Sequence, residues 1–205
     1  MSKGKQLTIW LIWLITWPTT IVYLYSILDP LPALQGREFD IISFTLLICV
    51  VAFFPIIVGE TPIFFIHGIS FAVFLYFGLF AEIILTQIAV IALMFKLRIS
   101  KHELYRIPLN LTLFLFVSII SAAIFYLAGG ENGPLTTMDI GTFIPIICYA
   151  LGTIVANQVS VHLLLMFITG KRSKFFSTSL LWDVATSSIT VPVGLVLYLL
   201  YTELG

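Results

Sequence analysis

Glu82 is the residue of this chain whose setting most clearly points to chemistry, because it interrupts the long apolar run 63–95. A charge in apolar surroundings is costly, so an ionisable residue in such a run is a functional candidate. Glu82 either contacts a ligand or a cation at the mouth of a cavity or extends its carboxylate to a membrane interface. His67, near the other end of the run, is expected to be solvated close to Glu60.

Asp183 is a second carboxylate in an apolar segment, and it begins a polar stripe. Ser187, Thr190 and Gly194 follow it at i+4, i+7 and i+11, which places all four on one helix face. We expect this face to look into a bundle, because lipid offers hydroxyl groups no partner. Asp183 either belongs to a binding site there or pairs with the basic residues of 171–174.

Amide and imidazole groups occupy two further apolar segments. Asn157 and His162 lie in 140–168, and Asn110 lies near the start of 107–127. Such groups either bind a ligand or form hydrogen bonds between helices. The ligand-binding candidates are therefore Glu82, Asn110, Asn157, His162, Asp183 and Ser187.

Other periodic faces favour packing over chemistry. Small residues at four-residue steps let helix backbones approach closely, and aromatic stripes contact lipid or neighbouring helices. Ser118, Ser121 and Ala122 are expected on an inward face together with Asn110. The packing faces are Gly152, Ala156 and Ser160 for the small residues and Trp10, Trp13 and Trp17 for the aromatic stripe.

Motifs of known catalytic or cofactor sites are absent from the sequence. It has no His-Glu-x-x-His metal motif, no phosphate-binding glycine loop and no nucleophile elbow. Cys49 and Cys148 lie apart in apolar runs, without the spacing of a metal or redox pair. We therefore expect no enzyme activity, no metal and no cofactor in this chain.

Composition identifies the class of protein. The chain is 60% hydrophobic and only 10% charged, with a mean hydropathy of +1.12, whereas soluble domains carry about 25% charged residues. The sequence predicts an all-α, polytopic transmembrane helix bundle that forms a single integral membrane domain over 1–205. Its expected surroundings are the lipid bilayer, and no nucleic-acid partner is expected.

The apolar segments define the expected helices. The run 63–95 would be about 50 Å long as one helix, well beyond a hydrocarbon core of about 30 Å. We therefore expect a short helical hairpin that turns at Gly78, giving about seven helices. The expected helices are 7–28, 41–58, 63–77, 79–95, 107–127, 140–168 and 179–201.

Charge placement supports the hairpin. With two crossings in 63–95, nine of the ten Lys and Arg residues fall on one side, and Arg37 is the exception. Basic residues are concentrated on the cytoplasmic side of membrane proteins. We therefore expect a cytoplasmic N-terminus and an extracellular C-terminus.

Several segments resemble a known family of bacterial proteins. The run 66–95 with its turn at Gly78, the segment 105–110, the segment 149–161 and the helix around Trp182 resemble the multi-helix membrane sensor module that precedes diguanylate cyclase (GGDEF) and HD-GYP domains. The resemblance implies a bacterial cytoplasmic membrane, a cyclic-di-GMP output and functional roles for Asn110 and Asn157. A further helix usually follows in that family, and this sequence carries no GGDEF or HD signature.

The leading hypothesis is a sensory or regulatory module that binds a small ligand or senses the bilayer. It would signal to a fused or partner cytoplasmic domain, or through a homo-oligomer. The first alternative is the substrate-binding subunit of a transporter, resembling those of energy-coupling-factor systems, although the bulky residues Trp10 to Trp17 replace the small-residue coupling face expected there. A structural subunit of a membrane complex is the second alternative.

Overall fold

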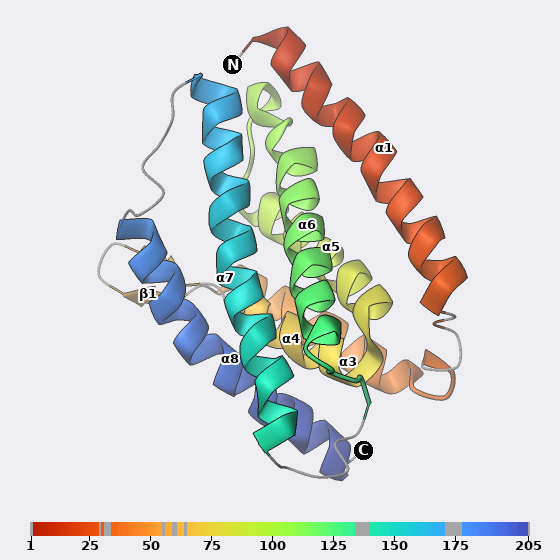
Figure 1. Cartoon of the computed structure of the whole chain (residues 1–205). Helices are drawn as coiled ribbons and strands as arrows, with labels where there is room; N and C mark the ends of the chain where they lie inside the picture. The colour runs from red at the N-terminus through yellow and green to blue at the C-terminus, as the bar shows by residue number, and fades with distance from the viewer. Residues whose placement is uncertain are drawn as a thin grey trace.

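The structure is a computed structural model that describes residues 2–28, 30, 34–54, 56–58, 61–63, 65–133, 140–170 and 178–204. These residues form an all-α bundle of seven α-helices, which confirms the predicted fold class (Figure 1). The helices are α1 (Lys3–Leu28), α3 (Glu38–Phe53), α4 (Ile66–Phe77), α5 (Leu79–Lys96), α6 (Arg106–Leu127), α7 (Ile140–Thr169) and α8 (Thr178–Leu204). A 3-10 turn, η1 (Lys101–Glu103), precedes α6.

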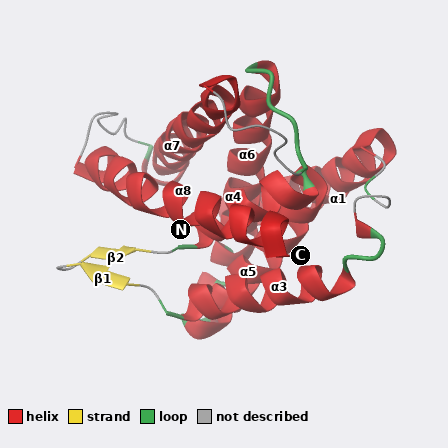
Figure 2. Cartoon of the chain, turned by 90° about the horizontal axis from the view of Figure 1, so that it is seen from below, coloured by secondary structure: helices red, strands yellow, loops and turns green. Residues whose placement is uncertain are grey.

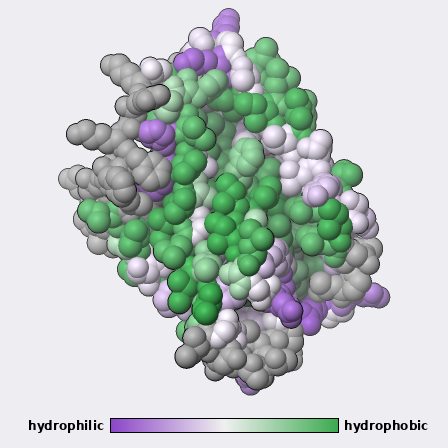
Figure 3. Space-filling view, viewed as in Figure 1, coloured by the Kyte–Doolittle hydropathy of each residue, from purple (hydrophilic) through white to green (hydrophobic). Residues whose placement is uncertain are grey.

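Five helical segments of the described chain are long and apolar enough to cross a membrane. Helix α4 is apolar but shorter, and α3 has 16 residues. Apolar residues cover most of the described middle of one face, and hydrophilic residues gather mainly toward its two ends (Figure 3). The chain is therefore built as a multi-pass membrane protein. The five segments are Lys3–Leu28, Leu79–Lys96, Lys101–Leu127, Gly141–Thr169 and Val184–Glu203.

The long apolar run divides at Gly78, as the sequence predicts. Gly78 has φ 88° and ψ 178°, a backbone conformation that glycine adopts without the steric conflict of a side chain. Helices α4 and α5 meet there and form a hairpin in which nearly all of α4 and most of α5 are buried. This hairpin is the centre of the bundle, and α3, α6 and α8 pack around it (Figures 1 and 2).

The predicted helix 41–58 ends too late by five residues. Helix α3 stops at Phe53, and Phe54 has φ −124° and ψ 72°, outside the helical region. The next residue is Pro55, and the ring of a proline disfavours helical geometry in the residue before it. Residues 56–58 instead form β1 (Ile56–Val58), which pairs antiparallel with β2 (Thr61–Ile63). The helix predicted at 63–77 accordingly begins at Ile66.

Helix ends that carry basic residues meet at one end of the bundle. The start of α1, the start of α6 and the end of α7 lie at the top of Figure 1, and η1 directly precedes α6. Lys5 fixes this arrangement, because its Nζ donates to the carbonyl oxygens of Phe167 and Ile168 at 2.6 and 2.9 Å. A cation at a helix C-terminus pairs with unsatisfied carbonyl groups.

Acidic residues lie at the opposite end. Glu38 and Asp40 begin α3, Glu131 follows the end of α6, and Glu203 lies in the last turn of α8. The predicted separation of charge therefore holds for the described residues. The basic residues of 171–174 lie outside them.

Helices α4 and α8 pack backbone to backbone through two glycines. A Cβ added to Gly68 would collide with the carbonyl oxygen of Thr190, and one added to Gly194 would collide with that of Gly68. Thr190 is fully buried, so the predicted inward direction of the α8 stripe is confirmed. The small-residue face of α7 also packs as predicted, since a Cβ on Gly152 would lie 2.9 Å from Ile124 of α6.

Candidate functional site

Glu82 joins three helices through one carboxylate oxygen. Its Oε1 accepts hydrogen bonds from Ser70 of α4, from Thr86 of α5 at 3.0 Å and from Ser118 of α6 at 2.9 Å. Glu82 is 1% exposed, so its carboxylate does not extend to a membrane interface, and the interpretation as a ligand contact stays a prediction. Its place in the first turn of α5, directly after the Gly78 turn, sets the carboxylate between α4 and α6.

The second oxygen of Glu82 is buried without a hydrogen-bond partner in the described part of the chain. Aromatic side chains of α4, α6 and α7 pack together in the core of the bundle. The ring of Tyr149 lies 4.8 Å from those of Phe71 and Phe74, and Phe125 contacts Phe74 edge-on. An apolar shell strengthens hydrogen bonds and makes an unpaired polar atom costly. We call Glu82 with Ser70, Thr86 and Ser118 the Glu82 centre, and its hydrogen bonds join three helices. The second carboxylate oxygen can still accept a proton or a hydrogen bond.

A small cavity of about 30 Å³ brings two predicted candidates together. Asn157 of α7 and Ser187 of α8 line it with His67, Thr153 and Thr186. This volume is about that of one water molecule. His67 is not solvated as expected, because its half-buried ring stacks on Phe114 of α6 at a centroid distance of 5.3 Å.

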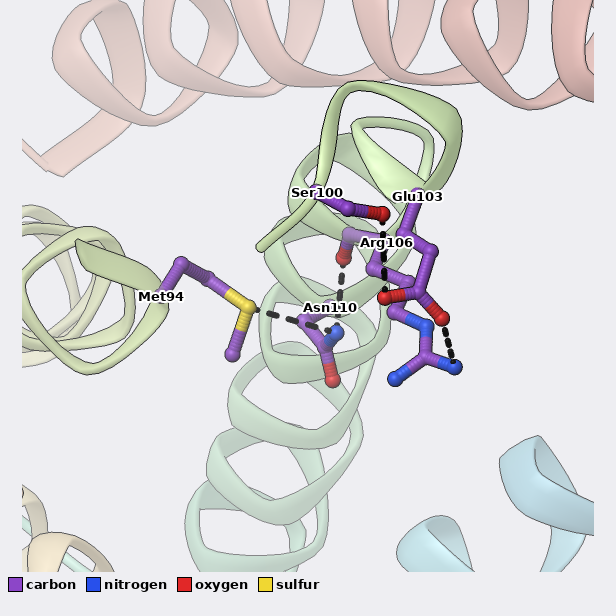
Figure 4. Close-up of polar contacts among 5 residues, drawn as sticks. All are labelled: Met94, Ser100, Glu103, Arg106 and Asn110. Carbon is purple, nitrogen blue, oxygen red and sulfur yellow. Dashed lines mark hydrogen bonds and ion pairs between the residues drawn. The ribbon is translucent and has the colours of Figure 1, made fainter. Parts of the chain in front are cut away.

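Asn110 is held within the start of α6. Its Nδ2 donates to the carbonyl oxygen of Arg106 at 2.6 Å and lies 3.8 Å from the sulfur of Met94 (Figure 4). Its neighbour Glu103 pairs with Arg106 at 2.5 Å and accepts from Ser100 at 3.4 Å. Asn110 therefore ties its helix to α5.

The structure does not bring the remaining candidates into these sites. His162 is half-buried on α7, two turns of helix beyond Thr153 and away from the linings of the cavities described here. Asp183 belongs to α8, but its side chain lies outside the described residues. Among the described residues, no three His, Cys, Asp or Glu side chains gather as metal ligands.

Two larger cavities separate α1 from the rest of the bundle. One of about 410 Å³ lies between Trp10 and Trp13 of α1 and the end of α5, Arg98 and the start of α6. The other, of about 340 Å³, lies between α1, α6 and α7 and is almost wholly apolar. Sequence reasoning assigned the tryptophans to lipid contact or packing and did not identify Arg98. The sequence feature that Trp10, Trp13 and Arg98 share is their position near the basic ends of their helices.

Comparison of the sequence with protein-family models finds no match. Searches of curated proteins and of solved structures also find no similar protein. A proposal for the function therefore depends on the geometry of the bundle.

Proposed function

We propose that this chain is a sensory or regulatory module of a bacterial cytoplasmic membrane. In this proposal a small ligand or a change in the bilayer shifts α1 against the rest of the bundle. The shift is passed to a fused or partner output of the cyclic-di-GMP type, or to a second copy of the chain. The basic end of the bundle faces the cytoplasm, in accordance with the positive-inside rule.

The low burial of α1 is the observation that supports this proposal. Ile9 is the only buried residue among those of α1, whereas nearly every residue of α4 is buried. Two cavities of ligand-binding size lie between α1 and its neighbours. A helix that rests on cavities has fewer contacts to lose when it moves than one inside a packed core.

Contacts at its basic end give α1 a fixed point. Lys5 binds the last carbonyl groups of α7, and Lys5 also lies 5.5 Å from the ring centroid of Phe167. The two cavities are lined on the α1 side by residues 9–13, whereas Trp17, Ile21 and Leu24 pack against the core. A displacement would therefore involve mainly the part of α1 that lines the cavities.

The Glu82 centre supplies the rigid part. Because Glu82 binds hydroxyl groups of α4, α5 and α6 at once, these helices resist separation. In this proposal α1 moves while α4, α5 and α6 keep their relative positions. The bundle then has two conformations, which differ in the position of α1.

Distance measurement between spin labels tests the proposal. Cys49→Ser and Cys148→Ser remove the native thiols, and Ile15→Cys on α1 with Leu127→Cys on α6 supply two exposed label sites. Leu46→Cys on α3 with Ile88→Cys on α5 form the control pair within the fixed part. In vesicles of different lipid composition, we expect the first distance to change and the second to stay constant. A constant first distance under all conditions contradicts the proposal.

The cavity volumes also support the transporter alternative, since a small organic substrate needs a similar space. Mass spectrometry of the purified protein separates the two functions. A tightly retained vitamin-like molecule, with paired ATPases as partners, would favour transport. A reading frame that continues beyond Gly205 into a cyclase or phosphodiesterase domain would favour sensing.

A further inference from the structure

We propose that the 410 Å³ cavity beside Trp10 and Trp13 binds an acyl chain of an anionic phospholipid, whose phosphate group is held by Arg98. The inference names the ligand class for the sensory function proposed above and rests on it. It concerns a different place from the Glu82 centre.

The walls of the cavity suit a hydrocarbon chain. Ile91, Met94 and Phe95 form the side provided by α5, and Ile107 and Leu111 form the side provided by α6. From Ile91 to Arg98 the lining extends along about 10 Å of the chain if it keeps a helical rise. The cavity therefore leads from the basic end of the bundle into its apolar part, which is the direction an acyl chain takes from its headgroup.

Two hydrogen-bond donors in this lining lack partners in the described residues. The Nε1 of Trp13 is buried without a hydrogen bond, and the exposed guanidinium of Arg98 makes no ion pair. Glu103, an acidic residue of the same end, is already paired with Arg106. The exposed guanidinium of Arg98 therefore fits an occupant with acceptor oxygens at its head, and a phosphodiester provides these.

The backbone at Arg98 gives independent support. Arg98 has φ 47°, and among the described residues other than glycine it alone has a positive φ. It follows the C-cap Leu97 of α5, a position that glycine usually occupies in this conformation. An arginine in a glycine position indicates that its side chain is required there.

The surrounding charge matches an anionic lipid. Lys96 and Lys101 lie close to the lining residue Arg98 in the sequence, so this segment of the chain is basic. Basic clusters beside membrane helices attract anionic headgroups. Because Trp10 and Trp13 belong to α1, an occupant would also set the distance of α1 from α5.

Tryptophan quenching in vesicles tests the site. Trp17→Phe and Trp182→Phe leave Trp10 and Trp13 as the fluorescent residues, and the probes are phosphatidylglycerol and phosphatidylcholine with brominated chains. We expect the brominated anionic lipid to quench at about fivefold lower content than the zwitterionic one. Arg98→Gly should abolish this preference while keeping the fold, because glycine accepts the backbone conformation of Arg98.

Two matched variants complete the experiment. Arg98→Asn, which also tolerates a positive φ, should behave as Arg98→Gly does. Lys101→Gln removes an exposed cation outside the cavity lining and should keep most of the preference. Equal quenching by both lipids in the unmodified cavity, or a full preference after Arg98→Gly, overturns the inference.

The outcomes also separate this inference from the function on which it rests. A preference for the anionic lipid with no change in the α1 to α6 distance would contradict sensing but leave the lipid site established. A distance change without the preference would support sensing and overturn the ligand assignment.

Discussion

The side-chain amide of Asn132 donates a hydrogen bond to the carbonyl oxygen of Phe74 at 2.6 Å, although the two residues belong to distant parts of the chain. Next to it, the N–H of Gly133 donates to the carbonyl oxygen of Leu75 at 2.9 Å. The last carbonyl groups of a helix have no partner within it. The segment that follows α6 therefore caps α4 beside the Gly78 turn, and Tyr126 holds Asn132 in place at 2.5 Å.

Asn132→Ala should lower the free energy of unfolding by about 1 to 2 kcal/mol, because it removes the donor to Phe74 and the acceptor for Tyr126. Thermal unfolding in detergent micelles measures the change. Glu131→Ala, at the exposed neighbouring position, is the control and should be nearly neutral. Equal effects of the two variants would show that the cap contributes nothing specific.

Gly68→Ala and Gly194→Ala should each destabilise the bundle by about 1 to 3 kcal/mol, because the new methyl group meets the backbone of the opposite helix. Gly4→Ala is the matched control in α1. Nothing lies within 4 Å of its added Cβ, and alanine favours a helix, so a small gain is expected. Denaturant titration in micelles gives all three values. A loss at Gly4 as large as at Gly68 would refute close helix contact as the cause.

Glu82→Ala should cost about 2 to 5 kcal/mol, because it leaves a cavity and removes the acceptor of three hydroxyl groups. Glu82→Gln keeps a carbonyl oxygen of similar size and should cost much less. The same unfolding measurement compares the pair. Similar losses for both variants would show that the charge, and not the acceptor oxygen, is what the centre requires.

Glu38 should titrate below its ordinary pKa of 4.5, because its own backbone N–H and that of Gly36 donate hydrogen bonds to the charged carboxylate. A lowered folded-state pKa means that the contribution to the first turn of α3 is present above pH 4.5. It is lost as the pH falls through the lower folded value. Carboxyl NMR shifts in micelles give the pKa. Glu38→Gln should remove this part of the pH dependence of amide exchange in the turn.

The sequence was sufficient for features that depend on length and periodicity. The run 63–95 is too long for one crossing, and Gly78 is the residue in it that can turn the chain, so the hairpin could be predicted. The stripe at Ser187, Thr190 and Gly194 indicated an inward face for the same kind of reason. Pro55 is a further local signal for the end of a helix, which the expected helix 41–58 did not take into account.

Contacts between distant segments could not be predicted. Periodicity placed Ser118 on an inward face of its helix, but it does not tell which neighbour that face meets. The hydroxyl groups of Ser70 and Ser118 reach Glu82 only because α4 and α6 both pack on α5. The same is true of Arg98, whose importance depends on the position of α1 and on a backbone angle that composition does not reveal.

The glycine crossing of α4 and α8 also has a consequence for biosynthesis. Helix α8 is the last of the described helices to leave the ribosome. The Gly68 face of α4 therefore lacks its contact with α8 while α5, α6 and α7 are made and inserted. A glycine surface of this kind offers little to lipid and gains its packing only when Gly194 arrives. We expect the packing of the central hairpin to be completed only once α8 has been inserted, so the bundle without α8 should be recognised by membrane quality control.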